Sequence, residues 1–234
     1  MKRRFQNSND SKPFKKSKLH EFFNLPIYEH RKNILNDIKQ YANLVIISTT
    51  GSGKTTQIPK FLLKDDINDS KIIGISQPRR IATISIATRV AEEMNCKLGE
   101  IVGYSVRFEY VYSDKTKLKF MTDGILLREA VTDPLLKSYS VIILDEVHER
   151  SLNNDILLGV VKNAQHQRRN NQMHPLKIII MSATIDPIPF IKFLGEDVTK
   201  YISISTRANK LAIKCLKKDS QVSLSLKSNN VIFG

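Results

Sequence analysis

The sequence predicts an α/β fold in which helices cover both faces of a mostly parallel sheet. Short apolar runs of strand length alternate with helix-length segments between about residues 25 and 213. One apolar run opens into a glycine-bearing loop, and another ends in two carboxylates. Because ligands of open α/β sheets bind beyond the carboxyl ends of the strands, we expect both features at one edge of the sheet.

The elements follow from the spacing of the apolar residues. Strands are expected at residues 44–48, 72–76, 101–106, 118–121, 141–144, 177–181 and 201–204. Helices are expected at residues 29–41, 54–64, 80–94, 124–131, 153–165 and 187–194. Pro59 falls inside the second helix and should either kink it or lie in a first turn.

The composition is that of a soluble globular protein. Hydrophobic residues make up 41% of the chain and charged residues 26%, and no apolar run approaches the roughly 18 residues of a membrane span. We see no secretory signal at the basic, polar N-terminus. Cys96 and Cys215 lie far apart, which favours two ordinary thiols in a reducing compartment over a disulfide or zinc site.

The net charge of +14 is concentrated near the two ends of the chain. Residues 1–18 carry a net charge of +6 and residues 207–234 a net charge of +5. We predict a disordered basic tail over residues 1–24, one domain over 25–213 and a C-terminal tail of uncertain structure over 214–234. Such a basic balance suggests a polyanionic partner.

Two basic runs, KRR at residues 2–4 and KKSK at 15–18, lie in the N-terminal tail. They are equally compatible with a nuclear import signal and with a solvated, disordered charge run. The first interpretation predicts that the protein is located in the nucleus or nucleolus, and the alternative location is the cytoplasm.

The loop between the first predicted strand and the second helix has the pattern of a phosphate-binding loop. Residues 45–56 read VIISTTGSGKTT. In such a loop backbone N–H groups bind phosphate oxygens, Lys54 reaches the β- and γ-phosphates, and the Thr55 hydroxyl ligates Mg²⁺. Ser48 stands where the full pattern has glycine, and we expect a modest change in loop geometry. The alternative is an ordinary turn between a strand and a helix.

Two carboxylates, Asp145 and Glu146, follow the buried strand predicted at residues 141–144. Asp145 could reach the Mg²⁺ held by Thr55, and Glu146 could polarise a water in line with the γ-phosphate. A lone pair of this kind would normally be a solvated strand end. Together with the phosphate-binding loop, it indicates hydrolysis of a nucleoside triphosphate.

Three further predicted strands end in polar residues that precede a helix or a turn. Arginines at a helix start suit a nucleic acid phosphate, and hydroxyls and free N–H groups suit the same role. Taken singly, the hydroxyl-bearing residues could be a helix cap or a turn. The residues are Arg79 and Arg80, Thr122 to Gly124, and Ser182 and Thr184.

These segments together resemble the DEAH-box ATP-dependent RNA helicases of superfamily 2. The resemblance covers about residues 25–213 and rests on TGSGKTTQ at 50–57, QPRR at 77–80, MTDG at 121–124, DEVHER at 145–150 and SAT at 182–184. RVAEEM at 89–94 and GYSVRF at 103–108 also look like family segments. The resemblance implies a RecA-like P-loop NTPase domain that uses ATP, and other nucleoside triphosphates as well, with Mg²⁺.

The resemblance also implies a role for each matching residue. The nucleotide would be held by Thr50, Gly51, Ser52, Gly53, Lys54, Thr55 and Thr56, with Arg89 stacking on its base, and Mg²⁺ by Thr55 and Asp145. Lys54, Asp145, Glu146 and His148 would be catalytic, Arg79, Arg80, Thr122 and Gly124 would contact the RNA backbone, and Ser182 and Thr184 would couple hydrolysis to RNA movement.

The chain departs from the family pattern at three residues. Val147 replaces the alanine of the box, and we expect an adjustment of packing without loss of activity. Ser48 and Thr49 stand where the family usually has glycine and glutamate, which could alter nucleotide affinity.

A larger departure is that the signature of the second RecA-like domain, which supplies arginine fingers in such helicases, is not found in the 234 residues. We therefore expect this chain alone to bind nucleotide, to hydrolyse it slowly and not to unwind duplexes. A fragment, a truncated isoform or an incomplete gene model would each explain the pattern. The competing functions are a non-catalytic nucleotide- or RNA-binding module and an unrelated P-loop enzyme such as a small kinase.

Overall fold

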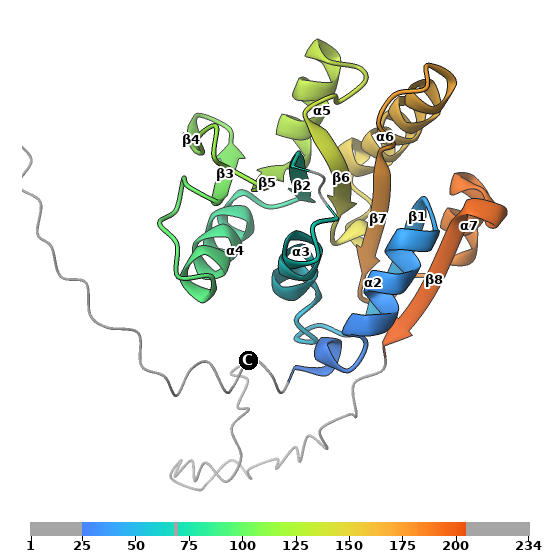
Figure 1. The fold of residues 1–234 in the computed structure, drawn as a ribbon, viewed down its shortest axis with the longest axis horizontal. Coiled ribbons are helices and arrows are strands. Elements are labelled where there is room, and N and C mark those ends of the chain that lie inside the picture. Colours follow the sequence, from blue (N-terminus) through green and yellow to red (C-terminus); the bar gives the residue numbers. More distant parts are fainter. Residues whose placement is uncertain (1–24, 68–69, 205–234) are drawn as a thin grey trace, which may run out of the picture.

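A computed structural model describes residues 25–67 and 70–204 of the chain. The tails predicted over 1–24 and 214–234, with the two basic runs and Cys215, lie outside the described residues. Within the described part, eight strands form one sheet in the order β4-β3-β5-β2-β6-β7-β1-β8 (Figure 1). The strands are β1 Asn43–Ser48, β2 Ile72–Gln77, β3 Val102–Val106, β4 Glu109–Val111, β5 Leu118–Thr122, β6 Tyr139–Leu144, β7 Lys177–Ser182 and β8 Thr199–Ile204.

The sheet is parallel except at the edge, where β4 pairs antiparallel with β3. The strand β4 is not among the strands expected from the apolar runs. It has three residues, too few for its alternation of polar and apolar residues to stand out, and it follows a turn in which Phe108 has a positive φ of 67°. The mostly parallel sheet itself is confirmed.

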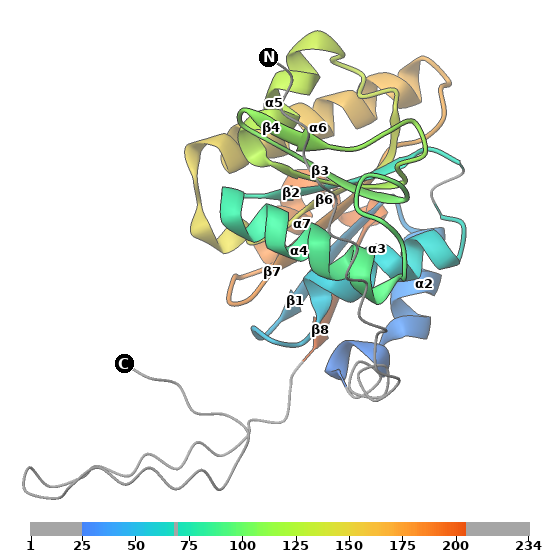
Figure 2. The same cartoon turned by 90° about the vertical axis from the view of Figure 1, so that its left-hand side faces the viewer.

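Helices cover both faces of the sheet, as predicted (Figure 2). On one face lie α2 Arg31–Gln40, α3 Lys54–Lys64 and α4 Arg80–Glu93, and on the other α5 Asp123–Thr132, α6 Leu152–Asn170 and α7 Ile188–Leu194. Three short 3₁₀ helices, η1 Pro26–Tyr28, η2 Val147–Glu149 and η3 Glu196–Val198, complete the described elements.

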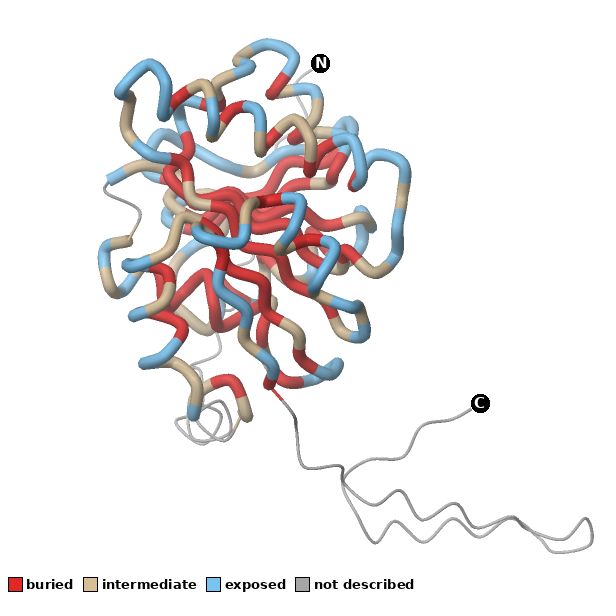
Figure 3. The backbone as a smooth tube through the Cα atoms, turned by 90° about the vertical axis from the view of Figure 1, so that its right-hand side faces the viewer, coloured by how far each residue is buried: buried red, intermediate tan, exposed pale blue. Residues whose placement is uncertain are grey.

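The alternation of side chains along each central strand divides the core into two clusters. In β6, Ile143 packs with the α2, α3 and α4 side, whereas its neighbour Ile142 packs with the α5, α6 and α7 side. Both are fully buried, and buried residues fill the centre of the molecule (Figure 3). Burying one such side chain contributes about 1.5–3 kcal/mol, so the core fixes the sheet and thereby the loops at its ends.

Two helices differ from their predicted form. The helix α3 continues through Pro59, so this proline does not lie in a first turn. The helix α6 extends to Asn170, five residues beyond its predicted end, and its last turns bury the charged residue Arg168. The described part contains no helix that is both long enough and apolar enough to cross a membrane.

Candidate nucleotide site and nucleic-acid contacts

The phosphate-binding loop joins β1 to α3, as the sequence predicts. Gly51 and Gly53 adopt positive φ angles of 80° and 91°, a region in which residues with a Cβ are strained. Gly53 caps the start of α3, and Lys54 is its first residue and only 4% exposed. Of the other loop residues, Ser52 and Thr56 are buried, whereas Thr50 and Gly51 are exposed. The loop therefore has the bent backbone that a phosphate cradle requires.

Ser48, the residue that departs from the usual glycine, forms a contact inside the loop. Its hydroxyl lies 2.8 Å from the hydroxyl of Ser52, and both side chains are buried. A glycine could not make this bond. The departure thus adds a link across the base of the loop while Gly51 and Gly53 keep their positive φ angles.

Asp145 lies at the end of β6 and is fully buried. Its Oδ2 atom accepts hydrogen bonds from the Thr55 hydroxyl at 2.5 Å and from Gln77 Nε2 at 2.6 Å. Burial raises the pKa of Asp145 to about 6, although the hydrogen bond from Thr55 acts in the opposite direction. The structure thus brings together the two predicted metal ligands, which lie far apart in the sequence.

Gln77 is a site residue to which the sequence analysis gave no role. It is the last residue of β2, and β2 is paired with β6 in the sheet. Its position in the QPRR segment was noted, but strand order was needed to show that it would lie beside Asp145. Its amide orients the carboxylate whose other oxygen accepts from the Glu146 N–H at 2.8 Å.

Glu146 turns away from the strand direction in the left-handed conformation, with φ 55°. Its Oε1 atom lies 3.5 Å from Lys54 Nζ, and its Oε2 atom lies 3.3 Å from His148 Nδ1. The side chain is 24% exposed, so water can reach it. The buried ammonium, the partly open carboxylate and the imidazole therefore form one cluster at the mouth of the phosphate-binding loop.

The residues predicted to couple hydrolysis to movement are only partly gathered. Ser182, at the end of β7, has its hydroxyl 3.4 Å from His148 Nδ1. Thr184 is exposed in the turn that follows. Val147, between Glu146 and His148, is fully buried in the core cluster on the α5, α6 and α7 side. The extra methyl groups of Val147 are thus accommodated by packing.

The four residues predicted to contact RNA lie at the carboxyl ends of neighbouring strands. Arg79 and Arg80 follow β2, and Thr122 ends β5, which pairs with β2. Both arginines are exposed and form ion pairs, Arg79 with Glu149 at 3.1 Å and Arg80 with Glu109 at 2.8 Å. Gly124 is exposed in the first turn of α5.

Asp123, beside Thr122, is buried and accepts hydrogen bonds from the hydroxyls of Ser76 and Ser151. Burial raises the pKa of its carboxyl group. These contacts hold the start of α5 against β2 and α6. Thr122 precedes the helix as its N-cap residue, but its side chain makes no capping hydrogen bond, so the capping alternative is not supported there.

Arg89, predicted to stack on the base, lies on α4 with its Nε atom 2.9 Å from Glu93 Oε1. The Glu93 side chain is 2% exposed and also accepts from Lys60 at 2.5 Å and from Gln57 at 2.9 Å, both on α3. Arg89 is therefore anchored to the helix that follows the phosphate-binding loop.

The segment before α2 also contacts the loop, which the sequence pattern does not predict. The Tyr28 hydroxyl donates to Gln57 Oε1 at 2.8 Å, and the Ile27 N–H donates to the Ser52 carbonyl at 3.3 Å. A Cβ on Gly53 would come within 2.8 Å of Leu25 Cδ1. These contacts of residues 25–28 have no local sequence signal, because they depend on where the chain folds back.

Fold and site together define a phosphate-loop nucleotide-binding domain. The model of the DEAD/DEAH box helicase family matches residues 28–189, more than half of the chain. The chain therefore belongs to the DEAD/DEAH box helicase family, and the expected RecA-like fold is confirmed.

Several curated proteins are similar to this chain. ATP-dependent RNA helicase DHX33 of Mus musculus is 49% identical over 178 residues, which are 76% of this chain and 26% of that protein. DHX33 of Homo sapiens is 49% identical over 76% of this chain and 25% of that protein. DHX33 of Drosophila melanogaster is 52% identical over 69% of this chain and 23% of that protein. This chain spans about a quarter of the length of the curated relatives it matches.

Proposed function

We propose that this chain is the ATP-binding part of an ATP-dependent RNA helicase, in which RNA-stimulated ATP hydrolysis drives unwinding or remodelling of RNA. The observation that carries the proposal is the convergence of four side chains from two distant segments, Lys54 and Thr55 with Asp145 and Glu146. Family membership and the names of the relatives point the same way.

The donor atoms at this site fit Mg²⁺. The Thr55 hydroxyl and the Asp145 carboxylate are hard oxygen ligands, and they already lie 2.5 Å apart. Mg²⁺ bound there would neutralise charge on the β- and γ-phosphates of ATP. Asp145 would have to be ionised to act as a ligand, and the hydrogen bond from Gln77 favours that form.

The residues of this chain would divide the remaining work. The N–H groups of the loop and the Lys54 ammonium bind phosphate oxygens. Glu146, held between Lys54 and His148, orients a water and accepts its proton. His148 in turn contacts Ser182, which supports a coupling role for Ser182 and, with it, Thr184.

RNA would lie along the carboxyl ends of β2 and β5, with its phosphates on Arg79, Arg80, Thr122 and Gly124. Contacts of this kind position a nucleic acid and carry little sequence information. The two arginines would have to exchange Glu149 and Glu109 for phosphates. Arg89 would lie against the base of the nucleotide.

Full activity would require a second RecA-like domain. Among the described residues, Lys54 Nζ and His148 Nδ1 are the basic side-chain atoms that lie within 4 Å of the Glu146 carboxylate. An arginine finger supplied from elsewhere contributes about 10³–10⁵ in rate. We therefore expect slow hydrolysis and no unwinding by the 234 residues alone. The alternative function is a non-catalytic nucleotide- or RNA-binding module.

The test is ATP binding and turnover by the purified chain, with and without single-stranded RNA and with Glu146→Gln as the control. Turnover that RNA stimulates and Glu146→Gln abolishes would support the enzyme. The same conclusion would be supported if the chain alone binds ATP without turnover, and ATP turnover appears when the second domain of a relative is added. Binding that no added domain converts into turnover would favour the non-catalytic module. Failure to bind ATP would overturn the enzyme and the nucleotide-binding module, and would leave an RNA-binding module as the alternative.

The basic runs at residues 2–4 and 15–18 lead us to propose a nuclear location. A fluorescent fusion of the chain should collect in the nucleus or nucleolus. Replacing the lysines and arginines of both runs by glutamine should return it to the cytoplasm, and an unchanged distribution would contradict the proposal.

A further inference from the structure

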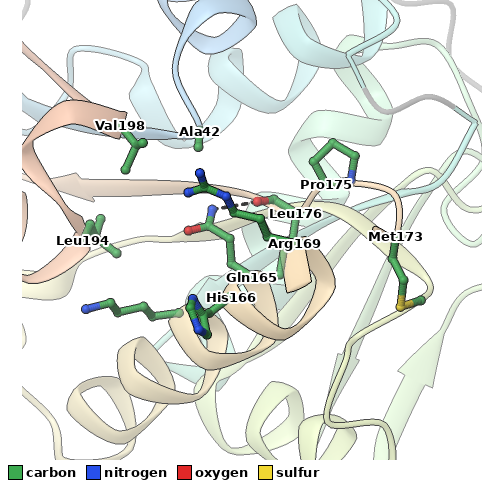
Figure 4. A pocket seen from close by; sticks show the side chains of 10 residues that line it. Ala42, Gln165, His166, Arg169, Met173, Pro175, Leu176, Leu194 and Val198 are labelled. Carbon is green, nitrogen blue, oxygen red and sulfur yellow. Dashed lines mark hydrogen bonds between the residues drawn. The ribbon is translucent and has the colours of Figure 1, made fainter. Parts of the chain in front are cut away.

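A second pocket lies where the strands begin, at the opposite end of the sheet from the nucleotide site at their carboxyl ends. Its volume is about 340 Å³, and it is lined by residues that precede three strands: Ala42 before β1, Leu176 before β7 and Val198 before β8 (Figure 4). The phosphate-binding loop follows the other end of β1. A ligand in this pocket would therefore leave the nucleotide site open.

The walls of the pocket are mainly aliphatic. Met173, Pro175, Leu176, Leu194 and Val198 line it, and Leu176 and Leu194 are almost completely buried. The polar group at its floor is already satisfied, because Gln165 Nε2 donates to the Leu176 carbonyl at 2.7 Å and to Asn43 Oδ1 at 2.8 Å. An apolar side chain could enter without leaving a buried donor unpaired.

Three cationic or titratable side chains of α6 border this apolar space. Lys162, His166 and Arg169 are spaced four and three residues apart and so lie on one face of the helix. Lys162 Nζ lies 4.2 Å from the centre of the Phe193 ring and donates to the Phe193 carbonyl, whereas Arg169 is exposed. None of the described ion pairs involves Lys162 or Arg169.

The charged residues that line the pocket favour the binding of an anionic ligand. Of the described residues that line it, none carries a carboxylate. The exposed carboxylates of Glu196 and Asp197 lie in the 3₁₀ turn that ends at Val198, between α7 and β8. A ligand with one apolar group and one anionic group would thus be oriented, with its anion toward α6.

We propose that this pocket binds an acidic peptide segment of a protein partner. One large apolar side chain of the peptide occupies the aliphatic space, and a neighbouring carboxylate pairs with Arg169, whose planar guanidinium matches a carboxylate with two hydrogen bonds. RNA is the less suitable occupant. Single-stranded bases are held by stacking on aromatic rings, and none of the described lining residues is Phe, Tyr or Trp.

The experiment selects a random-peptide display library against the immobilised chain. Selected peptides are resynthesised, and their affinities are measured for the wild type, for Arg169→Glu and for Arg128→Glu. Arg128 is an exposed arginine on α5, away from the pocket, so its variant carries the same change of charge. Thermal unfolding of both variants checks that they are folded, and Arg169→Ala replaces Arg169→Glu if the latter is not.

We expect the selected peptides to share a large apolar residue flanked by aspartate or glutamate. Arg169→Glu should lower the affinity for these peptides about tenfold or more, because one charge-assisted contact is lost. Arg128→Glu should change that affinity by less than about twofold. Replacing the peptide carboxylates by amides should weaken binding similarly. Peptides without this pattern, or equal affinity for Arg169→Glu, would overturn the proposal. So would polyuridylate that displaces the peptides and itself binds Arg169→Glu more weakly.

Discussion

The two edges of the sheet use charged side chains in different ways. At the carboxyl ends of the strands, the buried ammonium of Lys54 lies 3.5 Å from the partly exposed carboxylate of Glu146, and the buried carboxylate of Asp145 accepts from Thr55 and Gln77. At the end of the sheet where the strands begin, two adjacent arginines differ in burial. Arg168 is 1% exposed and donates to the carbonyls of Leu135, Leu136 and Tyr139, whereas Arg169 is exposed beside the second pocket.

This difference shows what offsets the desolvation free energy of the buried charged groups at each end of the strands. At the carboxyl ends, the Lys54 ammonium at the start of α3 is paired with Glu146 just beyond β6, at positions where a ligand could still reach both groups. At the other end, backbone carbonyls offset the desolvation of Arg168, which fixes this residue as part of the framework. Burial lowers the pKa of Arg168, so its charge is held at an energetic cost that the three carbonyl contacts must offset.

The largest effect on stability is expected for Arg168→Ala. The carbonyls of Leu135, Leu136 and Tyr139 would all lose the guanidinium donor, although the Leu136 carbonyl would still accept from the Tyr139 N–H. A buried polar group left unsatisfied costs about 1–3 kcal/mol. The free energy of unfolding in urea should fall by about 4 kcal/mol. The matched control is Arg169→Ala, which should change it by less than about 0.5 kcal/mol. Equal effects of the two variants would remove the contrast between them.

Lys54→Ala tests the charge pair at the carboxyl edge. The variant removes the buried ammonium and leaves Glu146 without that partner, so nucleotide phosphates would meet an uncompensated carboxylate. The affinity for a fluorescent ATP analogue should fall about a hundredfold. Lys64→Ala, at the exposed far end of the same helix, should bind the analogue as the wild type does, and similar losses in both variants would argue against a specific site.

Val147→Ala tests whether the residue that departs from the family pattern serves packing or chemistry. Val147 is fully buried between Glu146 and His148, so loss of two methyl groups should lower the free energy of unfolding by about 2 kcal/mol. Any ATP turnover should stay within a few-fold of that of the wild type, because the carboxylates and His148 remain. A hundredfold rise in turnover would show that valine restrains the chemistry.

Tyr28→Phe should give the smallest of these effects. It removes the hydrogen bond to Gln57 but keeps the ring, which packs edge-on against Phe61 at 5.1 Å. The free energy of unfolding should fall by about 1 kcal/mol. Tyr110→Phe serves as control, since Tyr110 is 71% exposed. If the two variants were equally stable, the segment before α2 would not be held to α3 by this bond.

Much of the fold could be predicted because its signals are local. The apolar runs predicted seven of the eight described strands, and the alternation with helices indicated a parallel sheet covered on both faces. Only β4 escaped, since three residues carry too little pattern. The loop around Lys54 and the carboxylates at 145 and 146 could be found for a similar reason: their chemistry needs those residue types in that order.

The sequence by itself therefore determined the fold class and the family pattern, and it predicted the residues that we propose to contact a nucleotide. Only the tertiary structure decided which side chains support them. Gln77 reaches Asp145 because β2 lies beside β6, and Tyr28 reaches Gln57 because the chain folds back onto α3. Adjacent arginines at 168 and 169 are chemically identical in the sequence. Their burial depends on which side of α6 faces the core, and that is fixed by packing over the whole domain.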